Sequence, residues 1–152
     1  MSVIAITGTK SGIGAATVAR LRERGHRIIS IDVAGADITA DLSRAEGRAG
    51  AVAAVLERCG GVLDGLILCA GVGPVVKPPS LVAAVNYFGS VALLDGLRDA
   101  LARGSSPAAV VVSSVASVQV TWEKNPIGQA LDRVVQRQAR RQIGIAKAYE
   151  GE

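Results

Sequence analysis

The sequence predicts an α/β protein in which a parallel sheet carries helices on both faces. Short branched-aliphatic runs alternate with longer segments that repeat apolar residues at helical spacing. Only 3% of the 152 residues are aromatic, and small and aliphatic residues dominate, as in sheets that are buried on both faces. The amino-terminal strand also runs through a glycine-rich turn directly into a helix. One domain is long enough to hold all of these segments around a single core.

Strands and helices are expected to alternate along the chain. Gly25 is expected to end the first helix, and Ser43 is expected to be the N-cap of the second. The expected strands are residues 3–7, 27–32, 36–39, 66–70 and 110–113, and the expected helices are residues 13–24, 43–60 and 81–101. Right-handed crossovers between parallel strands then give a doubly wound, Rossmann-like sheet in the order 3-2-1-4-5.

The glycine-rich turn has the features of a phosphate-binding loop. Gly8 lets the chain turn sharply off the strand, Gly12 removes a Cβ where a diphosphate would approach, and Gly14 allows close packing of the helix. The free N–H groups of the helix's first turn and its dipole then face the phosphates. A flexible turn without a ligand is the alternative, which the following helix and a correctly spaced acid disfavour. The residues expected to bind the cofactor here are Gly8, Thr9, Lys10, Ser11, Gly12, Ile13 and Gly14.

The acid is Asp32, which ends the second strand eighteen positions beyond Gly14. Dinucleotide-binding folds carry a carboxylate for the adenosine ribose at roughly 20 residues from the glycines. Such a carboxylate accepts hydrogen bonds from both ribose hydroxyls and repels a 2′-phosphate, so NAD is expected rather than NADP. Two readings compete with this one: Asp32 could simply start a turn, and Lys10 could attract a 2′-phosphate.

Composition and charge argue against several other classes of protein. No apolar stretch approaches the 18 to 20 residues of a membrane span, and no secretory leader is recognisable, so a cytoplasmic protein without a membrane partner is expected. Cys59 and Cys69 lack metal-ligand spacing, so no metal site is expected. His26, the only histidine, is expected to be a loop residue rather than a catalyst.

Further segments resemble those of one family, the short-chain dehydrogenase/reductases. The glycine loop reads Thr-Gly-Thr-Lys-Ser-Gly-Ile-Gly, and the sequence Cys69-Ala70-Gly71 resembles the family's Asn-Ala-Gly motif. Asn86 resembles its helix asparagine, Ser113-Ser114 its catalytic serine segment, and Asp41-Leu42 its adenine-facing pair. Within the family, the sequence is similar to those of the hydroxysteroid dehydrogenases and carbonyl reductases. The resemblance extends from Met1 to about Leu131.

The resemblance implies NAD-dependent hydride transfer between a secondary alcohol and a ketone, such as a 3-hydroxysteroid or another carbonyl compound. It implies that Ser114 holds the substrate oxygen, and that Asn86 supports a backbone kink and a proton-relaying water. The alternatives are a turn residue for Ser114 and a local hydrogen bond for Asn86. Asp41, Leu42, Ala70 and Gly71 are expected to contact the cofactor. A homo-oligomer, dimer or tetramer, is expected as well.

The end of the chain departs from the family's pattern. The family's proton donor is a tyrosine followed four residues later by a lysine, and no Tyr-x-x-x-Lys occurs here. Tyr149 is the remaining candidate, because Tyr87 belongs to the Asn86 helix. The family's last strands are also expected to be missing, which leaves the fifth strand as an open edge. Truncation, a shifted reading frame and genuine divergence after residue 131 each account for this ending.

The segment 131–143 is rich in Arg and Gln and can be drawn as a basic amphipathic helix that starts at Asn125 and Pro126. A solvated helix face explains this pattern as well as nucleic-acid binding does, so no nucleic-acid partner is expected. Two function classes therefore remain open. The first is an oxidoreductase of the family, and the second is a nucleotide-binding module, pseudoenzyme or fragment that lacks the chemistry.

Overall fold

The computed structural model describes residues 1–152 except 74, 116–118, 120, 127, 131 and 134–152. The chain divides into two compact units, Met1–Val112 and Ser113–Glu152, which are described separately. The expectation of one domain over residues 1–152 stays a prediction. Tyr149 and nearly all of the basic helix expected over residues 131–143 lie outside the described residues.

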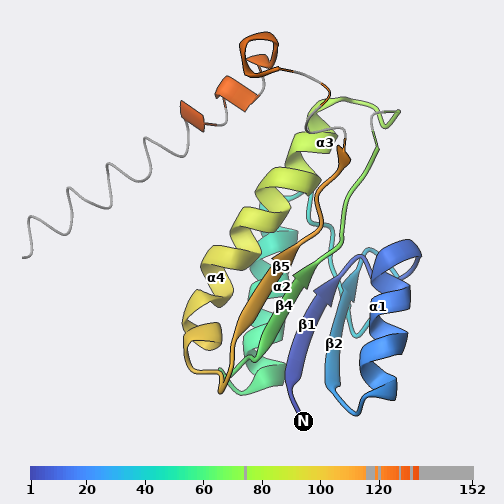
Figure 1. Ribbon diagram of the computed structural model, residues 1–152, viewed down its shortest axis with the longest axis vertical. Coiled ribbons are helices and arrows are strands. Elements are labelled where there is room, and N and C mark those ends of the chain that lie inside the picture. Colours follow the sequence, from blue (N-terminus) through green and yellow to red (C-terminus); the bar gives the residue numbers. More distant parts are fainter. Residues whose placement is uncertain (74, 116–118, 120, 127, 131, 134–152) are drawn as a thin grey trace, which may run out of the picture. The chain divides into compact units, whose positions relative to one another are not determined.

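The first unit is built on one five-stranded parallel sheet in the order β3-β2-β1-β4-β5, so the predicted strand order is confirmed. Each pair of neighbours runs parallel, and β1 has a partner on both edges. The strands are β1 Val3–Thr7, β2 Arg27–Asp32, β3 Ile38–Thr39, β4 Gly65–Leu68 and β5 Ala108–Val111. The carboxyl ends of the strands therefore meet at one edge of the sheet, where ligands bind in folds of this kind (Figure 1).

Helices cover the two faces of the sheet unequally. Helix α1 packs against β1 and β2 on one face, whereas α2 and α4 lie side by side on the other. The helices are α1 Gly12–Glu23, α2 Ala45–Cys59, α3 Ser80–Ala83 and α4 Ser90–Ala102, and a π-helical segment, Ala84–Gly89, joins α3 to α4. In Figure 1, strands β4 and β5 lie in front of α2, and no helix of the first unit is drawn over them.

The second helix does not begin where the sequence analysis expected. It starts at Ala45, with Arg44 at the N-cap position and no side-chain cap, so the expectation for Ser43 was wrong. The Ser43 hydroxyl and N–H both donate to Oδ1 of Asp41, at 2.6 and 2.9 Å. Ser43 therefore closes a turn at Asp41, and the helix begins two residues after it.

The single helix expected over residues 81–101 is divided into α3, the π-helical segment and α4. Its 23 residues, Ser80–Ala102, are long and apolar enough to cross a membrane by length and composition alone. A mostly buried core helix of a soluble protein passes the same test, but only 17% of this apolar stretch is buried, and its buried residues include Leu93, Leu97 and Ala100 of α4. The absence of a membrane partner stays a prediction.

In the second unit, the described residues include a 3₁₀ turn, Trp122–Lys124. Asn125 follows it, and its Oδ1 accepts the N–H of Gly128 at 2.8 Å, as an N-cap side chain does. This bond agrees with the expectation that Asn125 starts a helical turn.

Candidate cofactor-binding site

Two of the three glycines in the loop between β1 and α1 make close contacts, and the third faces open space. Gly8 has φ +71°, and a Cβ there would lie 2.7 Å from the backbone nitrogen of Ala70, so both conformation and space require glycine. A Cβ on Gly14 would overlap the carbonyl oxygen of Gly8, which brings α1 tightly onto the end of β1. A Cβ on Gly12 would meet nothing within 4 Å, so this part of the loop faces open space.

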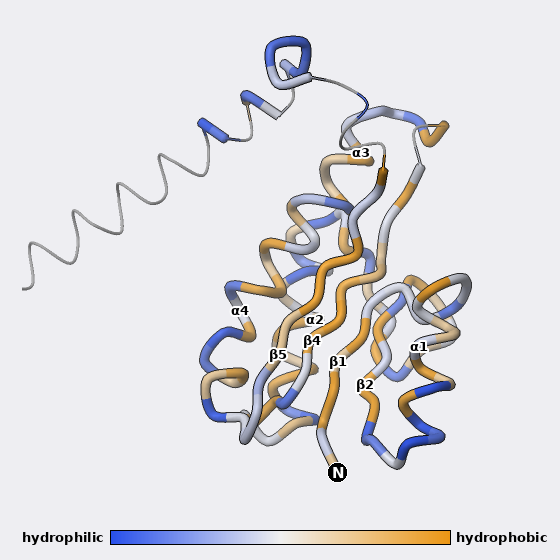
Figure 2. The backbone as a smooth tube through the Cα atoms, in the orientation of Figure 1, coloured by the Kyte–Doolittle hydropathy of each residue, from blue (hydrophilic) through white to orange (hydrophobic). Residues whose placement is uncertain are grey.

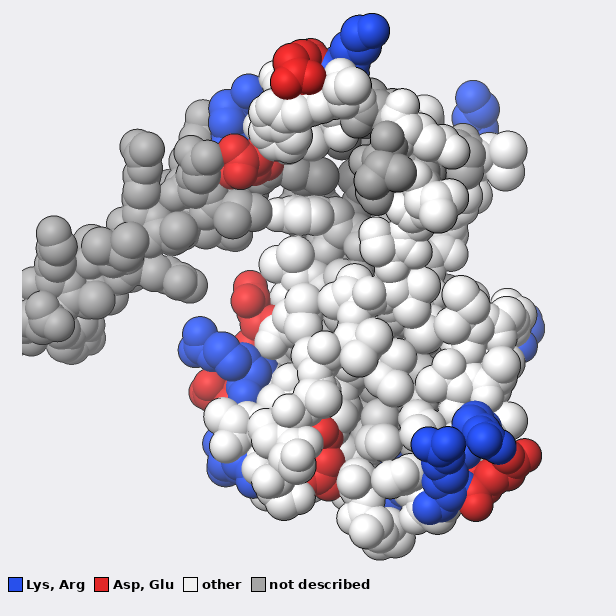
Figure 3. All heavy atoms as spheres, viewed as in Figure 1, with Lys and Arg blue, Asp and Glu red and all other residues white. Residues whose placement is uncertain are grey.

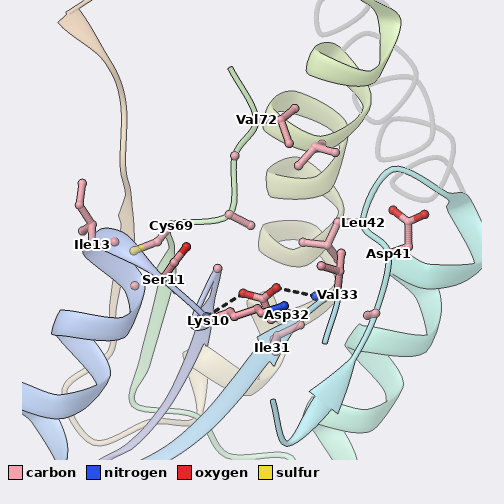
Figure 4. A pocket seen from close by; sticks show the side chains of 17 residues that line it. Lys10, Ser11, Ile13, Ile31, Asp32, Val33, Asp41, Leu42, Cys69 and Val72 are labelled. Atoms are coloured by element: carbon pink, nitrogen blue, oxygen red, sulfur yellow. Dashed lines mark hydrogen bonds between the residues drawn. The ribbon is translucent and has the colours of Figure 1, made fainter. Parts of the chain in front are cut away.

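That open space is part of a pocket of about 590 Å³ at the carboxyl edge of the sheet. Figure 4 shows how the glycine loop, the end of β2, the segment before α2 and the segment after β4 surround it. Every predicted cofactor residue except Thr9 lines the pocket. The sequence analysis missed five apolar lining residues and assigned no cofactor contact to Cys69. The five are Ile31, Val33, Ala40, Val72 and Val85.

Asp32 lies at the end of β2 with its carboxylate against the glycine loop (Figure 4). Its Oδ2 accepts the backbone N–H of Lys10 at 2.9 Å, and its Oδ1 accepts the N–H of Val33 at 2.7 Å. Neither bond was predicted from the sequence, where Asp32 was expected to be a ligand for ribose, with the start of a turn as the alternative. A third bond, from the N–H of Gly8 to the carbonyl oxygen of Ile31 at 2.9 Å, joins the same two segments.

The Asp41-Leu42 pair forms the opposite side of the pocket. Leu42 is buried, whereas hydrogen bonds from the Ser43 hydroxyl and N–H hold the pKa of the Asp41 carboxyl below its usual value. Nη1 of Arg48 donates to the carbonyl oxygens of Leu42 and Ser43 at 3.0 and 3.1 Å. A Cβ on Gly47 would overlap the Asp41 carbonyl oxygen, so α2 begins in close contact with this segment.

Thr7 joins the ends of the two central strands beneath the pocket. Its side chain is 1% exposed, and its Oγ1 accepts the N–H groups of Cys69 and Ala70 at 3.1 and 3.0 Å. These two amides follow the last residue of β4, so the hydroxyl satisfies donors that would otherwise lie beyond the strand. Burial raises the pKa of the Cys69 thiol, whose sulfur lies on the pocket wall.

Asn86 lies in the π-helical segment and holds the loop that follows β4. Its Oδ1 accepts the N–H of Val72 at 2.8 Å, and its Nδ2 donates to the Val72 carbonyl oxygen at 3.0 Å. Single-turn π segments often occur at functional sites, because they change the direction of a helix and its backbone bonds. The expected kink therefore coincides with an irregular helical turn, while the role of Asn86 in proton relay stays a prediction.

The other two expected catalytic residues belong to the second unit. Ser114 follows the end of β5 in the chain and is exposed, and Tyr149 lies outside the described residues. The described structure therefore brings together the cofactor residues and Asn86, all from the first unit. The expected catalytic group of Asn86, Ser114 and Tyr149 stays a prediction.

A family model matches most of this chain. The model describes the short chain dehydrogenases and matches residues 2–126, which include the glycine loop, Asp32 and Asn86. The chain belongs to the short-chain dehydrogenase family. Membership confirms the resemblance that the sequence motifs indicated, and the members of this family in the comparisons below are named dehydrogenases or reductases.

Two curated relatives are similar to this chain. The chain is 49% identical over 140 residues to the 3-alpha-hydroxysteroid dehydrogenase/carbonyl reductase of Comamonas testosteroni, covering 92% of this chain and 54% of that protein. It is 39% identical over 118 residues to the coniferyl-alcohol dehydrogenase of Pseudomonas sp. strain HR199, covering 74% of this chain and 44% of that protein. The chain therefore spans about half the length of the curated relatives it matches.

Solved structures of the family share the fold. The 3-alpha-hydroxysteroid dehydrogenase of Pseudomonas sp. B-0831, crystallised with NADH, is 56% identical, with a TM-score of 0.84 over 91% of this chain and 54% of that one. A short chain dehydrogenase/reductase from Brucella ovis is 28% identical, with a TM-score of 0.69 over 80% of this chain and 65% of that one.

Proposed function

We propose that this chain is the NAD(H)-binding portion of an oxidoreductase that interconverts a secondary alcohol and a ketone. The observation that carries the proposal is the pocket at the carboxyl edge of the sheet, where the glycine loop, Asp32 and the Asp41-Leu42 pair meet. The open space beside Gly12 and the volume of about 590 Å³ fit a dinucleotide. The NADH complex of a relative that is 56% identical supports the same choice of cofactor.

Different residues of the pocket would bind the different parts of the cofactor. The N–H groups of the loop and of the first turn of α1 would bind the diphosphate, and Asp32 would accept the hydroxyls of the adenosine ribose. Leu42 and the carboxylate of Asp41 would contact the adenine, and Ala70 and Gly71 would flank the cofactor beyond it. When bound, the nicotinamide supplies the hydride donor or acceptor, which the side chains of this chain do not provide.

For the substrate, we propose a 3-hydroxysteroid or another small carbonyl compound, because a relative that is 49% identical and a solved structure that is 56% identical are named for such activities. Ser114 would donate a hydrogen bond to the substrate oxygen, and Asn86 would support the backbone kink and a water that relays the proton. Tyr149 is proposed as the acid. General acid–base assistance of this kind is typically worth roughly 10²- to 10⁴-fold in rate.

A second candidate function is a nucleotide-binding module without catalysis. The observation that favours it is the missing lysine: no Tyr-x-x-x-Lys occurs in the 152 residues. Without a neighbouring cation, a tyrosine hydroxyl keeps a pKa of about 10 and is a poor acid at neutral pH. We therefore expect the 152-residue chain to show little or no turnover of a 3-hydroxysteroid with NAD(H).

Cofactor choice is tested by titrating NADH and NADPH separately, with calorimetry or cofactor fluorescence as the readout. NADH should bind more tightly, because the Asp32 carboxylate accepts the ribose hydroxyls and repels a 2′-phosphate. The variant Asp32→Ala should narrow the difference between the two cofactors. Equal or tighter binding of NADPH by the unaltered chain would contradict the role of Asp32 and favour Lys10.

Activity is tested by extending the chain with the remaining strands of a relative. The extended protein should oxidise a 3-hydroxysteroid with NAD, and Ser114→Ala should abolish that activity while cofactor binding persists. Rapid turnover by the 152-residue chain alone would contradict the module hypothesis and indicate that Tyr149 or a partner subunit supplies the acid.

A further inference from the structure

The glycine loop is joined to the end of β2 at two levels. The backbone N–H of Gly8 donates to the Ile31 carbonyl oxygen at 2.9 Å, which extends the strand pairing by one bond. Two residues further along the loop, the N–H of Lys10 donates to Oδ2 of Asp32 at 2.9 Å. Of these two bonds, only the second depends on a side chain, and that side chain is the proposed ribose ligand.

A carboxylate is suited to hold the loop and bind a ribose at the same time. It is an acceptor only, and its two oxygens offer about four lone-pair sites. The N–H groups of Lys10 and Val33 use one site on each oxygen, which leaves one site on each for the two ribose hydroxyls. An asparagine cannot do the same, because its amide nitrogen would face an N–H donor.

We propose that Asp32 is a positioning residue for the diphosphate as well as a ligand for the ribose. Its carboxylate holds the backbone at Lys10 so that the loop has its phosphate-binding shape before the cofactor arrives. This inference rests on the proposed function only in naming a diphosphate as the ligand of the loop. It follows that affinity for the phosphate portion depends on a side chain that takes no part in binding phosphate.

Amide hydrogen exchange in the cofactor-free protein, followed by NMR, tests the proposal without any ligand. Asp32→Ala should speed exchange at Lys10 by about tenfold or more, because hydrogen bonds to charged acceptors are among the stronger ones. Asp95→Asn, at an exposed aspartate on α4, is the matched control and should leave exchange at Lys10 unchanged. Equal exchange at Lys10 in the unaltered chain and in Asp32→Ala would overturn the proposal.

Titration with inorganic pyrophosphate, a probe without a ribose, tests the functional consequence. Removing a negative charge would by itself strengthen the binding of an anion. Release of the loop predicts the opposite, so Asp32→Ala should bind pyrophosphate about fivefold or more weakly. Unchanged or tighter binding by this variant would overturn the proposal.

The same bond can be removed from the other side. Lys10→Pro removes the N–H and leaves the Asp32 carboxylate in place, whereas Lys10→Ala keeps the N–H and removes only the side-chain charge. Lys10→Pro should bind pyrophosphate more weakly than Lys10→Ala, and equal binding by these two variants would overturn the proposal. If circular dichroism shows that Lys10→Pro does not fold, the Asp32→Ala measurements still decide the question.

Failure of this proposal and failure of the proposed function give different results. If the unaltered chain binds pyrophosphate but neither NADH nor NADPH, the proposed function fails, and the exchange and pyrophosphate experiments still test the loop. If NADH binds and Asp32→Ala changes neither exchange nor pyrophosphate affinity, Asp32 is a ribose ligand only.

Discussion

The two faces of the sheet differ in how much they bury. On the side of α2 and α4, fifteen of the described residues form one buried cluster that extends from β3 to the end of α4. On the side of α1, three residues, Ile4, Ile6 and Val18, form the buried cluster, and Ile67 of β4 is only partly covered beside it. One face therefore has a core that reaches β4, and the other has a core over β1 and β2 alone, while every residue of β5 is exposed.

The strand β5 marks the difference most clearly. Val110 pairs in register with Ile67 and is 52% exposed, although it is apolar. The next residue along the strand, Val111, is 49% exposed. Figure 2 shows apolar residues along β1, β4 and β5, and Figure 3 shows the charged side chains of the first unit mainly at the margins of the same view. Because buried apolar area provides most of the folding free energy, the α2 and α4 face should determine stability, while the α1 side carries the phosphate loop.

The largest effect should come from the face that α2 and α4 cover. Leu97→Ala on α4 removes a fully buried side chain and should lower the free energy of unfolding by about 2–5 kcal/mol. Val110→Ala, at an exposed position of β5, should lower the free energy of unfolding by less than about 1 kcal/mol. Urea unfolding of both variants measures the difference, and similar losses would show that the two faces contribute equally.

The α1 side can be altered with a large effect on binding and a small effect on stability. Gly12→Val places a branched side chain in the open space where the diphosphate is proposed to lie, so NADH affinity should fall about tenfold or more. Its φ of +54° adds a strain of about 1–2 kcal/mol. Gly73→Val, which also adds a side chain in open space but outside the pocket lining, should keep its affinity. A folded Gly12→Val with unchanged affinity would locate the phosphates elsewhere.

The exposed apolar side chains of β5, Val110 and Val111, should also influence self-association of the chain. β5 is the last strand of the sheet, and unpaired strand edges invite pairing with another chain. Val110→Lys places a charge among the exposed apolar side chains of β5 and should reduce self-association. Light scattering over a range of protein concentration measures this effect. If the unaltered chain self-associates and the variant does so equally, the association uses another surface, and if neither associates, the predicted homo-oligomer is wrong.

The smallest effect concerns pH and a polar contact on the α1 side. Ser30 lies on the same side of β2 as Ile28, and its hydroxyl and N–H donate to Oδ2 of Asp37 at 2.6 and 2.9 Å. These bonds hold the pKa of the Asp37 carboxyl below its usual value of 3.8. A lowered pKa in the folded state gives stability that is present above the ordinary pKa and is lost as pH falls through the folded value.

Unfolding measured between pH 7 and pH 2 should therefore show a part of the acid destabilisation, below about pH 4, that Ser30→Ala removes. Ser43→Ala is a useful comparison, because it removes the equivalent bond to Asp41 on the other side of the pocket. A Ser30→Ala variant with the same pH dependence as the unaltered chain would show that Asp37 contributes nothing measurable.

The parts of the fold that local patterns determine were predictable. The strand order and the glycine loop follow from apolar periodicity, from the spacing to Asp32 and from the handedness of parallel crossovers. Ser43 was misassigned because its hydroxyl and N–H donate to the Asp41 carboxylate, a strong acceptor two residues earlier, in a turn that precedes the helix. The π-helical turn at Asn86 was not predictable as such, because a shift of the backbone bonds by one residue has no compositional signature.

The site was predictable to the extent that motifs name residues. All but one of the expected cofactor residues line one pocket, because the ends of parallel strands meet at one edge. The bond from Lys10 to Asp32 depends on the path of a loop in three dimensions, which no spacing rule describes. Apolar lining residues such as Val72 and Val85 lie beside motif residues but belong to no motif themselves, so they were not predicted.

The position of β1 at the centre of the sheet has a consequence for the order in which the chain can fold during its synthesis. Its neighbours are β2, which begins at Arg27, and β4, which begins at Gly65. At a ribosomal rate of about 5–20 residues per second, β4 is made roughly 3–12 s after β1. The first strand to be made must keep one edge of unpaired N–H and C=O groups open for the whole of that interval. Chaperones that bind short aliphatic segments would therefore find Val3–Thr7 available early and hidden later.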